Sequence, residues 1–426
     1  MINASNFRAR SIVASLFVIM LFVPLTVCAA AINFESETIL RVFERNTAQK
    51  NDAKVLPVYE YLRGAVGSGE EVVSFHLSGW GRFDLADEGY FEDAGDGELM
   101  YGYLEYRPAG YNVNLRAGRQ YVFAGVANEA VDGVSVSAEA KGGMLFSVYG
   151  GLPVGLTDTD GAGGDMLVGG RVAHRSSLYQ FGLSYKLVEN DSATAQEQVG
   201  SDLALFLPGR VNLTGLSRYN IETEDFAEHS YEANIGLGPV NLRPFVERYR
   251  YEDYFNAGAK TVNPFRFLAI RDETLTVAGS DVSYNPAEDI NFMLRAKALD
   301  YEIADTAIYA SAMLTSYSDG VGNFGAEVGR LEGDLDRDSY TLSRLFAYLE
   351  DFNQAFPIEF ISADMMLAIY DEDIRGEGEA YFLSLGAGKN LMKGDLRLKA
   401  AAEYSSDPYY TEDLRGSVSA TYLFAP

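Results

Sequence analysis

The chain has 426 residues, of which 47% are hydrophobic, 13% are aromatic and 42 are glycine, and its formal net charge is −27. This acidity excludes nucleic acid as a partner, because phosphate binding requires a basic surface. Cys28 is the only cysteine, which excludes a disulfide within the chain, a thiolate zinc site and a Cys-x-x-Cys-His haem attachment.

The first residues have the order of a secretory signal peptide. Arg8 and Arg10 form a short basic region, Ser11–Val27 is an apolar run, and Ala29–Ala31 supply small residues at its end. This order predicts export, with residues 1–31 removed by cleavage.

Two other interpretations of this segment are a membrane anchor and a lipoprotein signal. The apolar run is short for a membrane span and contains Pro24, which disfavours the anchor. Val27 precedes Cys28 where a lipoprotein signal needs a small residue. We therefore expect residues 32–426 to form the mature protein.

Alternating side chains mark the stretch Tyr111–Tyr121 as a strand with two different faces. Its apolar face contains Tyr111, Val113, Leu115 and Ala117, and its polar face contains Asn112, Asn114, Arg116, Gly118 and Gln120. The same design recurs at residues 179–186, 290–297 and 396–403. Strands of about ten residues, tilted, are long enough to cross a bilayer, so this pattern predicts a transmembrane β-barrel.

The N-terminal half of the mature chain begins with strands predicted at Ser36–Glu44, Pro57–Ala65 and Val72–Asp84. An acidic stretch, Asp84–Glu98, follows and is predicted to be an extracellular loop. Its carboxylates are Asp87, Glu88, Glu92, Asp93 and Asp96.

Short turns and longer connections alternate along the chain. Short turns are predicted at residues 108–110, 141–143, 175–177, 208–210, 238–239, 285–289, 318–320, 350–357 and 391–394, and longer loops at 152–164, 189–199, 252–272 and 331–338. In outer-membrane barrels the short turns are periplasmic and the long loops extracellular. We therefore predict an all-β, single-chain antiparallel barrel of about 22 strands, within a range of about 16 to 22, with both ends of the mature chain in the periplasm.

The main alternative fold is a soluble β-sandwich or propeller. A soluble sandwich has no physical reason to sort its connections by length, and no repeat of the length of a propeller blade is present. The C-terminal run Leu414–Phe424 also alternates, and it resembles the assembly signal of Gram-negative outer-membrane proteins. The chain departs from that signal by continuing to Ala425 and Pro426.

Tyrosines are expected at the membrane interfaces, because the ring is apolar and the hydroxyl can remain in water. The candidates for two aromatic girdles are Tyr101, Tyr103, Tyr106, Tyr111, Tyr249, Tyr251, Tyr254 and Phe255. Ordinary packing between strands is the other interpretation of these rings.

The sequence gives little support to enzymatic or metal chemistry. The three histidines, His76, His174 and His229, fall on different predicted strands, and neither a Gly-x-Ser-x-Gly nor a His-Glu-x-x-His motif occurs. The segment Asp158–Asp165 has the carboxylate density of a calcium loop but lacks the full motif, so we favour a solvated loop. We expect no catalytic residues, no metal and no cofactor.

Charged residues on the polar faces of the predicted strands are expected to line the lumen, because a charge facing lipid is costly. These residues are Arg116, Lys186, Arg218, Glu232, Arg243, Glu247, Arg295, Lys297, Glu327, Arg397, Lys399, Glu403 and Arg415. Charged pore walls set ion selectivity, so we expect an interior that weakly prefers anions behind an acidic vestibule. The alternative is a lattice of structural ion pairs without a role in transport.

Three functions fit such a barrel, and the first is a porin-like channel for small hydrophilic solutes or ions. The runs Leu62–Arg63, Ser74–Asp84 and Arg116–Gln120 resemble porin-like proteins of anaerobic Gram-negative bacteria. Some members of that group sheathe multihaem cytochromes, so the resemblance implies a second possibility, a barrel with a protein partner in its lumen. A structural or adhesion barrel is the third.

Overall fold

The computed structural model describes residues 32–45, 51–67, 72–86, 89–154, 166–190, 193–251, 273–303, 305–334, 338–350 and 358–424. The predicted signal peptide lies outside these ranges. Within them, no helix has both the length and the apolar character that crossing a membrane requires.

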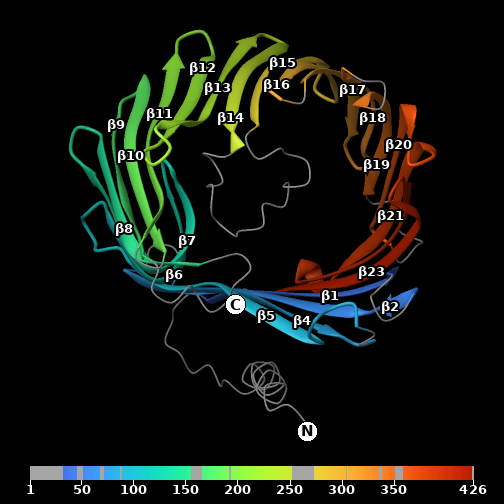
Figure 1. Ribbon diagram of the computed structural model, residues 1–426. Coiled ribbons are helices and arrows are strands. Elements are labelled where there is room, and N and C mark those ends of the chain that lie inside the picture. The colour runs from blue at the N-terminus through green and yellow to red at the C-terminus, as the bar shows by residue number, and fades with distance from the viewer. Residues whose placement is uncertain are drawn as a thin grey trace.

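The described chain consists almost entirely of strands (Figure 1). One short 3-10 helix, η2 (Met392–Gly394), interrupts them. The strands are β1 (Ile32–Arg45), β2 (Ala53–Val55), β3 (Pro57–Val66), β4 (Val73–Asp84), β5 (Gly95–Tyr106), β6 (Val113–Ala124), β7 (Ala127–Ala140), β8 (Met144–Pro153), β9 (Met166–Arg175), β10 (Tyr179–Asn190), β11 (Ala193–Leu207), β12 (Val211–Asn220), β13 (Asp225–Leu237), β14 (Val240–Arg250), β15 (Thr274–Ala287), β16 (Ile290–Tyr301), β17 (Asp305–Ser318), β18 (Gly322–Glu332), β19 (Tyr340–Glu350), β20 (Phe360–Ile374), β21 (Glu377–Leu391), β22 (Leu396–Asp407) and β23 (Tyr410–Phe424).

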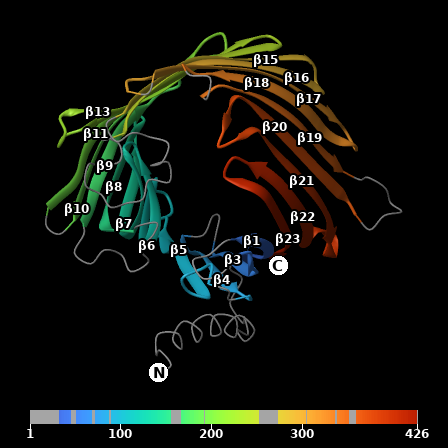
Figure 2. The same cartoon turned by 45° about the vertical axis from the view of Figure 1, so that its right-hand side comes forward.

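The strands form one antiparallel sheet that closes on itself. β1 pairs with β23 from Phe34 opposite Phe424 to Phe43 opposite Arg415. β2 and β3 both pair with β1 and together make one strand of the wall, so the barrel has 22 strands. Figures 1 and 2 show this wall surrounding a central space. The predicted all-β barrel is confirmed.

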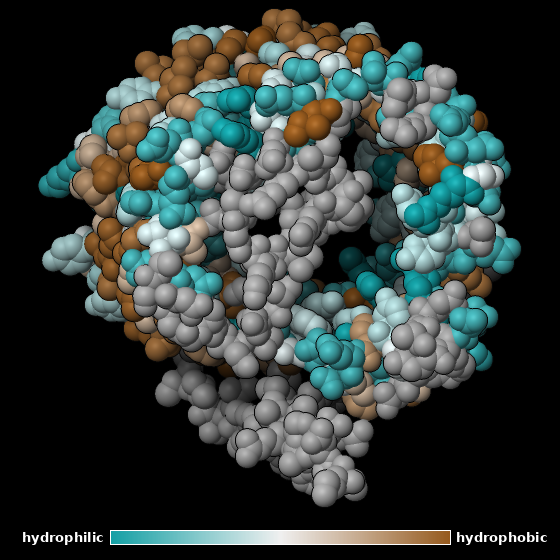
Figure 3. Space-filling view, viewed as in Figure 1, coloured by the Kyte–Doolittle hydropathy of each residue, from teal (hydrophilic) through white to brown (hydrophobic). Residues whose placement is uncertain are grey.

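The wall has an apolar outer face and a polar inner face, because alternate residues of a strand point to opposite sides. On β16, Leu294 points outward and its side chain is 57% exposed, whereas Arg295 and Lys297 point inward. Residues directly opposite each other on neighbouring strands share a face, and the register carries this division around the ring. Figure 3 shows hydrophobic residues along the outer rim and hydrophilic residues toward the opening.

The connections at one end of the barrel, which we call the turn side, are short, and the longest connections lie at the other end, the loop side. The loop side also contains tight connections, at residues 125–126, 375–376 and 408–409. The prediction of a long loop at 189–199 is wrong, because β10 continues to Asn190 and β11 begins at Ala193. The polar residues Gln196 and Gln198 belong to the inner face of β11, opposite Val188 and Lys186 of β10, which explains the misleading composition.

A row of glycines bends the wall at β6, β7 and β8. Gly118 pairs with Gly133, and Gly133 pairs with Gly151. Gly118 has φ +123°, and a Cβ on Gly133 would lie 2.1 Å from the Gly150 carbonyl oxygen. Only glycine fits where backbones approach this closely, and glycines of this kind mark sharp bends in barrels.

Beyond this row the β6–β7 hairpin, residues 119–132, folds into the barrel; we call it the inner hairpin. The backbone N–H of Val126 donates a hydrogen bond to the Ser184 hydroxyl of β10 (3.0 Å). Because β8 and β9 separate β7 from β10 in the wall, this contact crosses the inside of the barrel. A small apolar core holds the hairpin there, formed by Val122, Ala124, Ala127, Val131, Tyr149 and Leu167.

Candidate functional site

The structure places every one of the thirteen predicted lining residues on the inner face of the wall. The register puts Arg116 on this face of β6, Lys186 on β10, Arg218 on β12, Glu232 on β13, Arg243 and Glu247 on β14, Arg295 and Lys297 on β16, Glu327 on β18, Arg397, Lys399 and Glu403 on β22, and Arg415 on β23. Their role in a pore remains a prediction.

Two of these residues are covered rather than exposed to the lumen. Lys186 is 1% exposed, and its ammonium forms an ion pair with Glu129 of the inner hairpin (2.5 Å). Arg218 is 8% exposed and lies 3.4 Å from Glu228. The alternation of the strands predicts the inner face correctly, but it contains no information about a hairpin that covers part of that face.

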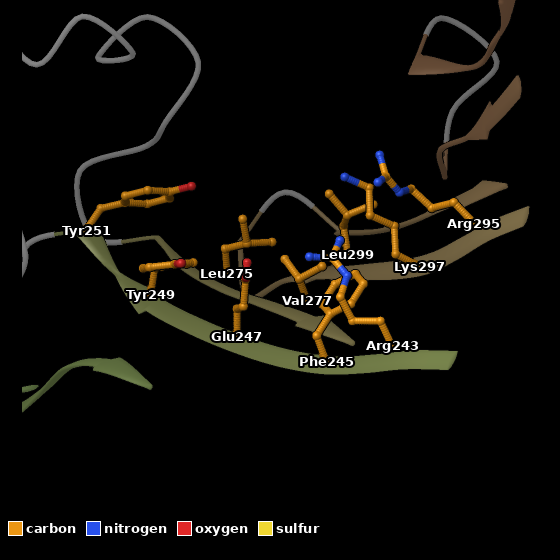
Figure 4. A pocket seen from close by; sticks show the side chains of 10 residues that line it. All are labelled: Arg243, Phe245, Glu247, Tyr249, Tyr251, Leu275, Val277, Arg295, Lys297 and Leu299. Carbon is orange, nitrogen blue, oxygen red and sulfur yellow. The ribbon is translucent and has the colours of Figure 1, made fainter. Parts of the chain in front are cut away.

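A hollow of about 590 Å³ opens on the inner face of β14, β15 and β16. Figure 4 shows its ten lining side chains, which extend from these neighbouring strands toward the interior. They are Arg243, Phe245, Glu247, Tyr249, Tyr251, Leu275, Val277, Arg295, Lys297 and Leu299. The cations lie at the end nearer the turn side, and the apolar residues lie nearer the loop side.

The charged part of the hollow has three cations and one carboxylate among its lining residues. Arg243 and Arg295 both donate to Asp281, whose side chain is only 8% exposed and lies beneath them. The side chains of the two arginines remain 40% and 36% exposed. Burying the acid and exposing its partners leaves N–H donors at the surface of the hollow.

Lys297 differs from the two arginines because it has no ion pair with any described residue. Its ammonium lies 5.5 Å from the centre of the Tyr309 ring, a cation–π contact that keeps the charge available. Lys297 is therefore the cation of the hollow whose charge is least compensated.

The apolar part of the hollow combines aromatic and aliphatic side chains. Tyr251 follows the end of β14, and burial raises the pKa of its phenol, with smaller contributions from Tyr301 and Glu273. Together with the cations, this surface suits a small solute that has both an anionic group and an apolar part.

The sequence prediction assigned the tyrosines of the hollow to a membrane girdle, and this assignment is wrong. Tyr249 and Tyr251 are separated from Arg243 and Glu247 by even numbers of residues, so all four side chains are expected on the same face of the wall. The alternation that predicted the charges to lie in the lumen therefore also predicts the two rings to lie there. The prediction also missed Asp281, because the small residues on both faces of β15 hide its alternation.

Tyr101 and Tyr103 were also expected in a girdle, but both point into the barrel. Tyr103 stacks on His76 with ring centroids 4.9 Å apart and contacts Arg116 through a cation–π interaction. Tyr106, on the outer face, and Tyr111 are exposed at the turn side, as a girdle requires. Tyr254 and Phe255 lie outside the described residues.

The acidic loop is shorter than predicted, because β4 ends at Asp84 and β5 begins at Gly95. Glu92 and Asp93 lie in this loop, whereas Asp96 belongs to β5 and lies 3.6 Å from Arg82. Asp87 and Glu88, as well as the acidic segment 158–165, lie outside the described residues.

Chemistry beyond charge and shape finds little support in the described part of the chain. No group of three or more histidine, cysteine or acidic residues there is arranged to hold a metal ion. His76 lies on the inner face of β4, and His174 and His229 lie on the outer faces of β9 and β13. The three rings do not form one site.

Comparison with known proteins supports the fold. No protein-family model matches the chain, and no curated protein matches it. Among solved structures, the P pilus usher (PapC) translocation pore is similar with a TM-score of 0.52 at 12% identity, covering 92% of this chain and 99% of the pore. Acinetobacter baumannii OccAB3 has a TM-score of 0.47 at 9% identity, covering 94% of this chain and 100% of that chain.

Pseudomonas aeruginosa OccK2, solved in complex with glucuronate, has a TM-score of 0.46 at 10% identity, covering 93% of this chain and 98% of that chain. Identities this low concern the fold alone. With the closed wall of 22 strands, its apolar outer face and its charged interior, the protein has the fold of a single-chain antiparallel β-barrel.

Proposed function

We propose that this barrel is a channel through which small hydrophilic solutes cross the outer membrane passively, with a preference for anions. The observation that carries this proposal is that Lys297 in the hollow, like Arg397 and Lys399 of β22, has no ion pair with a described residue, whereas Arg243 and Arg295 are paired with Asp281 and Glu232. A wall with an excess of one charge attracts ions of the opposite sign and repels like ions, and a narrow lumen strengthens both effects.

The remaining inner ion pairs are consistent with a wall built to hold its cations in place. Arg344 and Asp364 form a bidentate pair across β19 and β20 (2.6 and 3.0 Å). Arg397 and Lys399 of β22 form no ion pair with described residues, and Arg397 donates instead to Asn390 (3.0 Å). The inner wall therefore contains both ion pairs that hold the strands together and cations, Arg397 and Lys399, that have no ion-pair partner among the described residues.

The proposal is tested by single-channel recording of the refolded protein in a planar bilayer under a salt gradient. We expect stable open steps and a reversal potential that favours anions. A reversal potential favouring cations would overturn the anion preference, but the proposal that the barrel is a channel would still stand. An absence of conductance from demonstrably folded barrels would overturn the channel itself.

Lys297 allows a sharper test of the hollow, because replacing it disrupts no ion pair with a described residue. We expect Lys297→Glu to lower the anion-to-cation permeability ratio by about tenfold. The change moves two charge units, each worth at most about 1 kcal/mol to an ion about 4 Å away in water. Screening by salt and the greater distance to a passing ion reduce the total effect on the ratio to about 1.4 kcal/mol, which corresponds to a factor of ten.

The control for this variant is Lys141→Glu, which makes the same change in net charge at an exposed turn outside the hollow. Asp281→Asn should shift the ratio the other way, because it removes the acid that neutralises Arg243 and Arg295. If Lys297→Glu and Lys141→Glu shift the reversal potential equally, the hollow does not set selectivity.

A further inference from the structure

The wall between β5 and β6 is joined over a much shorter length than the wall on either side of it. β5 pairs with β6 over five positions only, from Tyr106 opposite Leu115 to Gly102 opposite Arg119. Toward the loop side β5 continues to pair with β4, and β6 continues to pair with β7. The facing edges of residues 95–101 and 120–124 have no backbone pairing with each other; we call this part of the wall the seam.

The seam results from the bend in the wall described above. At Gly118 and Gly133 the strands β6 and β7 turn inward together, and the contacts of Val126 and Glu129 with β10 hold them there. β5 remains with β4 in the outer wall. The two edges therefore separate at the level of the glycine row.

One side chain bridges the seam in the described structure. The Arg119 guanidinium donates to the Leu99 carbonyl oxygen of β5 (3.0 Å) and forms a bidentate pair with Asp132 of β7 (2.8 Å for both bonds). The register places Arg119 and Asp132 on the outer face, beside Ala117 and Val134. The Arg119 side chain is only 13% exposed and that of Asp132 is 37% exposed, so the ion pair is largely enclosed between the two edges of the seam.

The outer rim of the seam is apolar. Leu99 and Phe123 are 42% and 75% exposed, and Tyr121 stacks beside Phe123 with ring centroids 6.4 Å apart. The seam lies in the half of the wall toward the loop side, which corresponds to the outer leaflet in the predicted orientation. At the seam the backbone hydrogen bonds between β5 and β6 stop because the wall bends. Among the described strands, this is the place where such a bend brings the polar lumen next to the apolar outer surface.

We propose that the seam is a lateral gate through which a single-chain amphiphile moves between the lumen and the outer leaflet, with the Arg119–Leu99 contact as its latch. The polar head would travel on the lumen side, and the apolar tail would contact the exposed rim. Opening requires the loss of one side-chain hydrogen bond instead of a row of backbone bonds, which in the rest of the wall prevents such movement. The proposal goes beyond passive diffusion along the barrel axis and does not depend on ion preference.

The test uses a bridge across the seam. A β-bulge opposite Ser78 and Gly79 makes Leu99 the next outward-facing residue after Gly102 on β5, and Tyr121 is the next one after Arg119 on β6. Leu99→Cys with Tyr121→Cys therefore places a thiol on each edge and keeps the Leu99 carbonyl group. Cys28, the only native cysteine, lies in the predicted signal peptide. A short bis-thiosulfonate reagent closes the seam, and a reducing agent reopens it.

The readout is uptake of dansyl-undecanoate by outer-membrane vesicles whose lipopolysaccharide leaflet slows spontaneous insertion. We expect the bridge to reduce the protein-dependent rate to that of vesicles lacking the protein, with recovery after reduction and with potassium chloride conductance unchanged. The matched control is Ala298→Cys with Ile308→Cys, an outward-facing pair in a fully paired part of the wall. Uptake that is unaffected by the seam bridge, or equally reduced by the control bridge, overturns the gate.

A second variant tests the latch separately. Arg119→Met combined with Asp132→Asn removes the donor to the Leu99 carbonyl oxygen without leaving a lone charge in the seam. We expect faster amide hydrogen exchange over residues 95–101 and faster dansyl-undecanoate uptake in barrels that still conduct potassium chloride. Unchanged exchange and uptake would overturn the latch. Because conductance is recorded independently, failure of the gate is distinguishable from failure of the proposed channel.

Discussion

Gly133→Ala is expected to prevent normal assembly of the barrel. A Cβ at this position would lie 2.1 Å from the Gly150 carbonyl oxygen and 2.7 Å from the Gly151 Cα. Both atoms belong to the backbone of the neighbouring strand, so no side-chain rotation relieves the clash, and β7 must lose its pairing with β8 or the bend must open. The fraction of refolded protein that migrates as a compact band before heating on a denaturing gel measures the effect.

The matched control is Gly81→Ala, because Gly81 also lies in a strand but its Cβ would meet only the Asp96 carbonyl oxygen at 3.8 Å. This variant should fold as the parent does, with a small gain or loss from the change in β propensity. Equal folding yields for the two variants would show that the glycine row does not determine the bend.

Glu129→Gln is expected to lower the free energy of unfolding by about 3–5 kcal/mol, because it leaves the buried Lys186 ammonium without its partner. The side chain of Lys186 is 2% exposed, and the pair with Glu129 at 2.5 Å is its one ion pair among the described residues. Denaturant unfolding of the refolded barrel in detergent, followed by circular dichroism, measures this change.

Replacing the other member of the pair should lower the free energy of unfolding by less. Lys186→Met leaves Glu129 one-third exposed and able to contact water, and the double variant replaces the pair with neutral side chains of similar size. We expect the double variant to be more stable than Glu129→Gln alone. If all three variants unfold at the same denaturant concentration, the ion pair does not hold the inner hairpin against β10.

The architecture was predictable because its signal is local. A period of two along each strand is visible in residues such as Leu294, Arg295 and Lys297, and it requires no knowledge of distant contacts. The closed wall followed from strand number and from the sorting of short and long connections, although the tight turns of the loop side were partly misread. Parity alone placed the charged side chains on the inner face.

The inner hairpin and the hollow were not predictable to the same extent. The Val126–Ser184 hydrogen bond joins residues 58 positions apart, and nothing in the sequence near either residue announces it. The hairpin buries Lys186, which parity alone would expose. Tyr249 and Tyr251 were misassigned because residue type was given more weight than parity, although parity contained the correct answer.

The closure between β1 and β23 has a consequence for biogenesis. It joins the first and last strands, and the Thr421–Glu37 contact connects residues 384 positions apart. Loop closure over such distances makes folding slow, and until the last strand arrives the edge of β1 presents unpaired amides that attract other chains. We therefore expect a truncation that removes β23 to leave an aggregation-prone sheet instead of a smaller barrel.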